Sequence, residues 1–198
     1  MRYIFGALVL VVLSAVAQAG FVADSVQVDL VQDGPGHRPD WAGPPAFVFE
    51  LLPDAAGNGR LDIEEHYLGP DPFPIVVSGQ TDADPIMSII KDVENDSDFT
   101  WTGYSITVPD GGDITFVGTP TSDRMTLVSQ SAYALEFGAP DAVADGEWVQ
   151  FSFDVLIPST GPFTFTLTQE PIPEPATLGL LGLGGAVLIL RRRRLRHA

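Results

Sequence analysis

Hydrophobic residues in the middle of this chain recur at every second position, which is the side-chain period of a β-strand. The clearest example is residues 148–157, in which one set of five residues alternates with another: Val149, Phe151, Phe153, Val155 and Ile157 against Trp148, Gln150, Ser152, Asp154 and Leu156. Similar short runs are separated by turns rich in Gly, Pro and Asp. They predict about nine or ten strands, at residues 26–30, 47–52, 75–77, 86–93, 100–108, 114–117, 125–128, 133–137, 148–157 and 163–168. This pattern predicts an all-β fold, an antiparallel β-sandwich or jelly roll.

The N-terminal end does not alternate. Arg2 precedes an apolar run at residues 4–13, and Ala17 and Ala19 supply the small residues of a cleavage site. This arrangement is typical of a secretory signal peptide, so we expect residues 1–19 to be removed and the secretion machinery to export the rest. The alternative is an N-terminal transmembrane helix, which the short run and the missing stop-transfer charge disfavour.

The C-terminal end holds a second uninterrupted apolar run. Residues 176–190 contain no charge, and as a helix they would span about 22 Å, against about 30 Å for a hydrocarbon core. Snorkelling side chains and local thinning of the bilayer can close this gap. A basic cluster follows directly, made of Arg191, Arg192, Arg193 and Arg194. Basic clusters stay on the cytoplasmic side, so we predict a transmembrane helix with a stop-transfer signal.

A polar element precedes this run: Pro173, Glu174 and Pro175, which cannot continue a helix. Together, the three ordered parts of residues 171–198 resemble the PEP-CTERM sorting signal. The resemblance implies that an exosortase, a membrane enzyme similar to a cysteine transpeptidase, reads the signal and cleaves near the Pro-Glu-Pro element. It also implies a surface or extracellular destination, among polysaccharide or biofilm material. The alternative is a plain C-terminal membrane anchor.

Between the two end signals, residues 20–170 are long enough for one domain with its own core. They contain four basic residues against 25 acidic ones, a net charge of 4 − 25 = −21. Such a domain repels phosphate backbones, which excludes nucleic acid as a partner, and it attracts cations such as Ca²⁺. The chain has no cysteine, so stability must come from packing or a metal rather than from disulfides.

Residues 54–65 partly fit the calcium-binding loop of an EF-hand. Four side chains take ligand positions of that loop: Asp54, Asn58, Asp62 and Glu65. Ala56 removes one further oxygen ligand. The alternative is a Gly/Asn hairpin or loop with acidic flanks. A second candidate calcium site is a group of acidic residues further along: Asp82, Asp84, Asp92, Glu94, Asp96 and Asp98.

Two tryptophans suggest a second kind of binding. By alternation, Trp101 and Trp148 both fall on polar strand faces, where indole rings can stack on sugars. The alternative is that loops or edge packing cover both rings.

Catalysis has little support. The domain has two histidines without HExxH spacing, and the chain has no G-x-S-x-G elbow. We therefore expect a structural or matrix protein rather than an enzyme, with a carbohydrate- or calcium-binding module as the second possibility and a hydrolase as a distant third.

Overall fold

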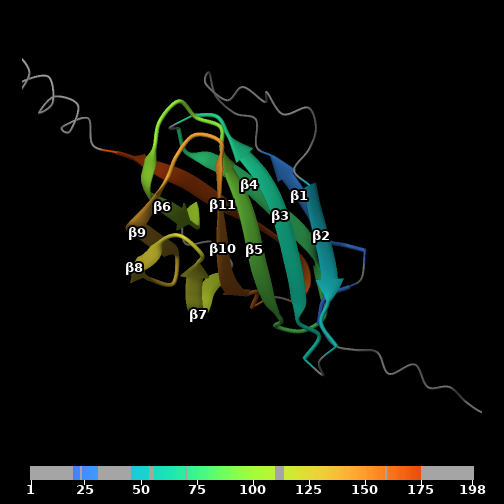
Figure 1. Cartoon of the computed structure of the whole chain (residues 1–198). Helices are drawn as coiled ribbons and strands as arrows, with labels where there is room; N and C mark the ends of the chain where they lie inside the picture. Colours follow the sequence, from blue (N-terminus) through green and yellow to red (C-terminus); the bar gives the residue numbers. More distant parts are fainter. Residues whose placement is uncertain are drawn as a thin grey trace, which may run out of the picture.

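The computed structural model describes residues 20–22, 24–30, 46–53, 56–69, 71–109, 114–158 and 160–174, and it contains eleven strands within them (Figure 1). The predicted signal peptide, the apolar run at residues 176–190 and the four arginines after it lie outside these ranges. Within the described ranges, no helix is long and apolar enough to cross a membrane.

The strands form two sheets that lie as layers (Figure 1). The six-stranded sheet has the order β1 (Gln27–Leu30), β4 (Phe73–Thr81), β11 (Gly161–Pro173), β6 (Trp101–Thr107), β9 (Ala134–Val143) and β8 (Thr126–Gln130). The five-stranded sheet has the order β2 (Ala46–Leu51), β3 (Gly59–Tyr67), β5 (Ile86–Asn95), β10 (Glu147–Leu156) and β7 (Thr115–Ser122).

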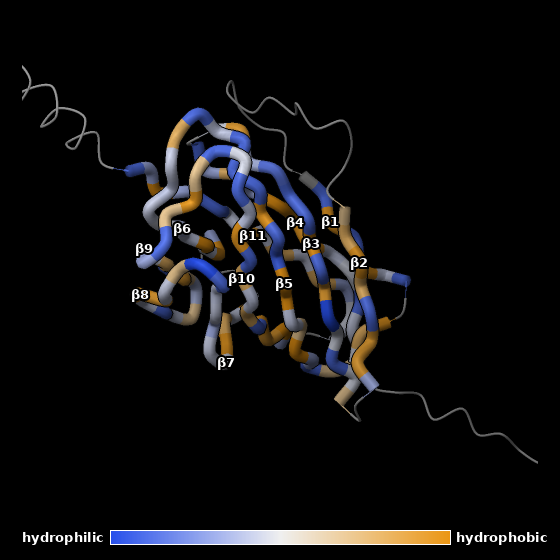
Figure 2. Tube along the Cα trace, viewed as in Figure 1, coloured by the Kyte–Doolittle hydropathy of each residue, from blue (hydrophilic) through white to orange (hydrophobic). Residues whose placement is uncertain are grey.

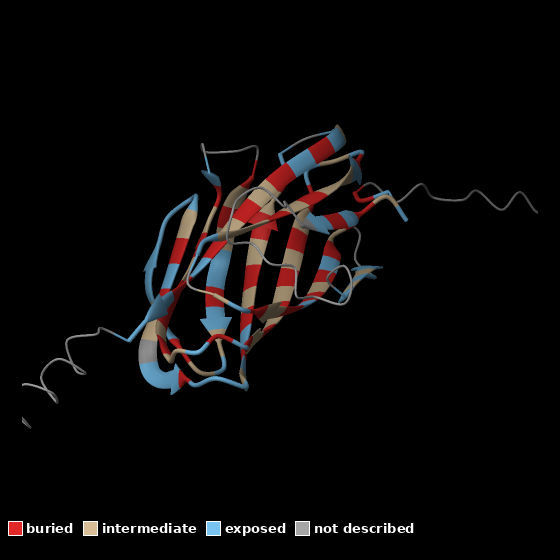
Figure 3. Cartoon of the chain, turned by 90° about the horizontal axis from the view of Figure 1, so that it is seen from above, coloured by how far each residue is buried: buried red, intermediate tan, exposed pale blue. Residues whose placement is uncertain are grey.

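The core fills the space between the two sheets because each strand turns alternate side chains inward. Buried and less buried residues alternate along the strands (Figure 3), and hydropathy alternates along β3 and β5 in the same way (Figure 2). The inward residues of both sheets form one hydrophobic cluster. Tyr104 of β6 stacks on Phe151 of β10 across the two layers, with ring centroids 4.6 Å apart. Each aromatic ring buried in this way contributes about 1.5–3 kcal/mol.

The predicted all-β fold with two packed sheets is confirmed in its coarse form. Each of the ten predicted strands overlaps an observed strand. The purely antiparallel pairing was wrong in one place: β3 runs parallel to β5, and every other described pair is antiparallel. The chain leaves β3, crosses to the other sheet as β4 and returns as β5, so β3 and β5 have the same direction.

The strand that the sequence did not predict is β3. Its apolar residues alternate with polar ones, but an inward position is occupied by Glu65. A carboxylate in an inward position hides the period of two, so the sequence predicts an EF-hand loop, or a Gly/Asn hairpin or loop, at residues 54–65. The hairpin is what the structure shows, because β2 and β3 pair antiparallel.

Candidate functional site

The last strand of the domain runs into the Pro-Glu-Pro element without a linker. The first part of β11 pairs with β4, and its last part, from Thr168 to Pro173, pairs with β6. In the pairing with β6, Pro173 lies opposite Trp101. The backbone N–H of Glu174 then donates a hydrogen bond to the carbonyl oxygen of Thr100 over 2.9 Å. Pro173 is therefore the last residue of β11 in the sheet, and Glu174 is hydrogen-bonded directly after it, whereas Pro175 lies outside the described residues.

Two prolines fit into this strand because it has only one described neighbour there. The pairing with β4 ends at Gln169, so beyond that residue β11 is bonded only to β6 among the described strands. Proline has no N–H to donate and is tolerated where one edge of a strand is open. The side chain of Thr102 adds hydrogen bonds from its Oγ1 to the carbonyl oxygens of Ile172 and Pro173, 3.4 Å each. Ile172, Pro173 and Glu174 are exposed.

Fold and junction together define a class of protein: an all-β domain whose last strand ends in the Pro-Glu-Pro element, at the exposed Pro173. Residues 171–194 match the family model of the PEP-CTERM protein-sorting motif. A search of curated proteins finds no match to the chain. The motif implies export, membrane-associated processing by an exosortase, and sorting to the cell envelope. The other residues predicted to act in export and sorting lie outside the described residues: Ala17, Ala19, Arg191, Arg192, Arg193 and Arg194.

The predicted EF-hand site was wrong for the residues that the structure describes. Asp62 and Glu65 belong to the same strand, three positions apart, so they point to opposite faces of the sheet. Asp62 is paired with Arg60 on the outer face, at 2.8 Å between Nε and Oδ1. Glu65 is only 3% exposed and is paired with Lys91 in the core. Two carboxylates on opposite sides of a sheet cannot bind one ion.

Asn58 also has another role. Its Oδ1 accepts a hydrogen bond from the backbone N–H of Ile86 over 2.8 Å, which holds the turn before β3 against the start of β5. Asp54, the first ligand of the predicted loop, lies outside the described residues.

The predicted sugar platform was wrong for Trp101, which is 0% exposed. Its indole N–H donates a hydrogen bond to Ser97 Oγ over 3.0 Å. The alternation is broken between Trp101 and Gly103, where the pairing with β9 shifts register. This bulge turns both Trp101 and Tyr104 inward, although they are three residues apart.

Trp148 is 39% exposed on the outer face of the five-stranded sheet. It lies next to Glu94 across the β10–β5 pair, and Glu94 lies next to His66 across the β5–β3 pair. The rings of His66 and Trp148 meet edge to face, with centroids 5.2 Å apart. Trp148 therefore belongs to a polar row that crosses three strands.

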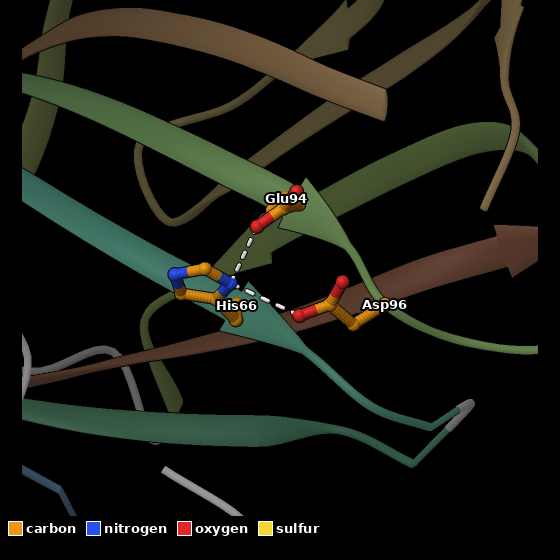
Figure 4. Close-up of side chains that lie close together, drawn as sticks. All are labelled: His66, Glu94 and Asp96. Atoms are coloured by element: carbon orange, nitrogen blue, oxygen red, sulfur yellow. Dashed lines mark hydrogen bonds and ion pairs between the residues drawn. The ribbon is translucent and has the colours of Figure 1, made fainter. Parts of the chain in front are cut away.

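The end of this row holds a cluster that the sequence did not single out as a unit (Figure 4). His66 Nδ1 lies 2.6 Å from Glu94 Oε2 and 3.0 Å from Asp96 Oδ2. One possible ligand atom from each of the three residues lies within 4.8 Å of the other two. The backbone N–H of Asp96 donates to the carbonyl oxygen of Tyr67 over 3.0 Å, which fixes the turn after β5 against the end of β3.

One imidazole nitrogen and two carboxylate oxygens are donors that suit a divalent transition ion. Of the six residues in the predicted acidic group, only Glu94 and Asp96 belong to this cluster. His66 was missed because nothing in the sequence shows that β3 and β5 are neighbours. The signal available in the sequence was the alternation of polar and apolar residues at the end of β3, which places His66 on the outer face and its neighbour Tyr67 on the inner face.

Proposed function

We propose that this protein is an exported domain of the cell surface that is released from its C-terminal signal by an exosortase. Cleavage takes place close to Pro173, Glu174 and Pro175. The observation that carries the proposal is the junction: the domain ends in a paired strand, and the matched sorting motif begins inside that strand. Cleavage after Pro173 therefore leaves every strand of the folded domain complete.

The steps of sorting follow from the order of the segments. The signal peptide starts export, and the apolar run at residues 176–190 holds the precursor in the membrane while the arginines after it stop translocation. The Pro-Glu-Pro element then stands at the outer membrane surface next to the folded domain. In this scheme Glu174 supplies a recognition charge and the prolines present an extended backbone.

We further propose that the released domain is a structural, non-enzymatic component of the extracellular matrix, associated with exopolysaccharide. Its strong negative charge supports solubility outside the cell and repulsion of other polyanions. The resemblance of the sorting signal supports the polysaccharide setting. A glycan array probed with the processed protein tests the association, and the absence of any bound polysaccharide would count against it.

Intact mass of the protein recovered from cells tests the sorting proposal. In a host that carries the exosortase, the surface fraction should hold a chain that ends near Pro173. In a matched strain without the exosortase, the chain should remain in the membrane and end at Ala198. A chain that ends at Ala198 in both strains would reduce the tail to a simple anchor.

A charge-matched pair of variants sharpens this test. Glu174→Gln keeps the backbone hydrogen bond to Thr100 but removes the charge from the motif, so processing should slow. Glu170→Gln removes an exposed carboxylate from the same strand outside the Pro-Glu-Pro element, and processing should continue at the normal rate. Equal rates for both variants would argue that the carboxylate is not read.

A second candidate function is cation binding on the outer face of the five-stranded sheet. It is favoured by the convergence of His66, Glu94 and Asp96 on one point. This cluster replaces the EF-hand loop as the place to look for a metal, and its donors favour a transition ion over Ca²⁺ because Ca²⁺ prefers six or more oxygen ligands.

A further inference from the structure

A buried polar cluster lies between the two sheets. Lys91 and Glu65 come from neighbouring strands of the five-stranded sheet, and Gln169 and Tyr104 come from the facing strands β11 and β6. All four side chains are buried in the core. An amine, a carboxyl group, a primary amide and a phenol thus share one water-excluded place in the middle of the sandwich.

The Glu65 carboxyl group connects the amine to the amide. Lys91 Nζ lies 2.7 Å from Glu65 Oε2, and Gln169 Nε2 lies 3.4 Å from Glu65 Oε1. The amine and the amide are therefore separated only by the two oxygens of one carboxyl group. On its other side the amide is polarised, because Tyr104 Oη donates a hydrogen bond to Gln169 Oε1 over 2.8 Å.

Lys91 is poorly accommodated as a charged group. A charged ammonium has three hydrogens to donate, yet among the described residues Nζ has a single hydrogen-bond partner, Glu65. Complete burial lowers the pKa of the Lys91 amine, and the neighbouring Glu65 opposes this effect only in part. A buried lysine with a lowered pKa is the form in which the amine acts as a nucleophile.

We propose that Lys91 and Gln169 join in an intramolecular amide bond that the folded domain forms by itself. The proton of the Lys91 ammonium passes to the Glu65 carboxylate, and the neutral Nζ attacks Cδ of Gln169. The phenol of Tyr104 stabilises the negative charge that develops on Oε1. Glu65 then delivers this proton to Nε2, the bond between Cδ and Nε2 breaks, and ammonia leaves. The Glu65 carboxylate takes up the second proton that Nζ loses as it becomes the amide nitrogen, so Glu65 ends as a neutral acid.

The reaction is balanced without any further reactant. One N–C bond forms and one breaks, and neither carbon nor nitrogen changes oxidation state. The ammonium, the carboxylate and the primary amide become a secondary amide, a neutral Glu65 carboxylic acid and ammonia. The buried charge pair thereby disappears, which removes the cost of keeping two ions in the core.

The bond would connect the two layers of the sandwich at a mechanically useful place. It joins β5 in the five-stranded sheet to β11 in the six-stranded sheet, four residues before Pro173. Any pull on the C-terminal end of the domain reaches β11 first. A chain without cysteine has no disulfide for this purpose, and a covalent link between distant residues likewise restricts the unfolded chain.

Mass spectrometry of tryptic digests of the full-length protein tests this inference directly. Trypsin cleaves after Arg60, Lys91 and Arg124 when the Lys91 amine is free. If the amide bond has formed, cleavage after Lys91 is blocked. Residues 61–124 then stay in one piece, attached to the peptide that begins at Met125. The mass of this branched product should be the sum of its parts less one ammonia.

Variants separate this chemistry from a purely structural role. Glu65→Gln keeps the shape of the side chain but cannot carry the proton, so the bond should form at least about 100-fold more slowly. Tyr104→Phe should slow it as well. The neutral double variant Lys91→Met with Glu65→Gln gives the reference mass, and it avoids leaving one buried charge alone.

Two results would overturn the proposal. The first is a folded wild-type protein that trypsin cleaves fully after Lys91, with no loss of ammonia from its mass. The second is a cross-link that forms equally fast in wild type and in Glu65→Gln. Neither readout depends on sorting, because the cluster is complete whether the chain ends at Pro173 or at Ala198.

Discussion

The backbone N–H of Glu174 donates a hydrogen bond to the carbonyl oxygen of Thr100, over 2.9 Å. This bond holds the charged residue of the sorting motif against the residue before β6. Pro173, one position earlier, is still in register with Trp101. An enzyme that binds the motif as an extended strand must therefore compete with β6 for the same backbone.

This competition predicts that a flexible insertion speeds up processing. A short Gly/Ser linker placed between Ile172 and Pro173 releases the Pro-Glu-Pro element from β6, while β11 keeps its pairing up to Ile172. We expect the cleaved form to accumulate faster in a pulse-chase experiment.

The control for that experiment is the same linker placed between Gly111 and Gly112, far from the motif in the chain. It should leave the rate of processing unchanged. Slower cleavage with the linker before Pro173 would show instead that the exosortase recognises the motif as part of the sheet.

The two tryptophans of the predicted sugar platform should differ strongly in their effect on stability. Trp101→Ala removes a fully buried ring and its hydrogen bond to Ser97, and it should cost about 3–5 kcal/mol of unfolding free energy. Trp148→Ala removes a partly exposed ring and should cost about 0.5 kcal/mol or less. Urea unfolding measures both, and equal losses would contradict the burial of Trp101.

The sequence predicted the strands well where one face is apolar and the other polar, as in β10. It failed where an inward position carries an ionic group, and Glu65 in β3 is the example. Its partner Lys91 lies on a strand that is distant in sequence, so local patterning cannot reveal the pair. The register shift at Gly103 was equally hidden, because a bulge depends on how β6 meets its neighbours rather than on its own residues.

Gly103 gives a direct test of that bulge. A Cβ at this position would lie 2.8 Å from the backbone carbonyl oxygen of Phe137, which cannot move aside easily. Gly103→Ala should therefore destabilise the protein by about 1–3 kcal/mol. Gly69→Ala is the matched control, since nothing lies within 4 Å of its Cβ position, and its thermal midpoint should stay close to that of wild type.

The cluster of His66, Glu94 and Asp96 predicts binding of a divalent transition ion. Titration of the metal-free protein with Zn²⁺, Mn²⁺ or Ni²⁺ in a calorimeter should show one site.

Single substitutions identify the ligands of that site. His66→Ala and Glu94→Gln should each weaken binding by at least about tenfold. Asp98→Asn, in the same turn as Asp96 but outside the cluster, should bind as wild type does. If heat is released equally by all variants, the ion binds elsewhere on the acidic surface. If no heat is released at all, the cluster is only an ion pair between a histidine and two carboxylates.

The two tyrosines of the core predict loss of stability at alkaline pH. Burial, followed by the charge of Glu65, raises the pKa of both Tyr67 and Tyr104 in the folded protein. In the unfolded chain a tyrosine releases its proton near pH 10. Their contribution is therefore complete below about pH 10 and is lost as the pH rises above it, because only the unfolded state gains from deprotonation. Each phenol adds a slope of about 1.4 kcal/mol per pH unit.

Lys91 acts in the opposite direction if its amine is free. Burial lowers its pKa, so the unfolded chain holds the extra proton, and stability rises with pH up to about 10.4, the usual value for lysine. Above that value only the tyrosines contribute to the slope. Urea unfolding between about pH 10.5 and 11.5 should show the free energy of unfolding fall with pH, and Tyr104→Phe should reduce this slope by about the contribution of one proton, 1.4 kcal/mol per pH unit. The exposed Tyr133 provides the control, and Tyr133→Phe should follow wild type. If Tyr104→Phe leaves the decline unchanged, the phenol is not protected in the core as the structure has it.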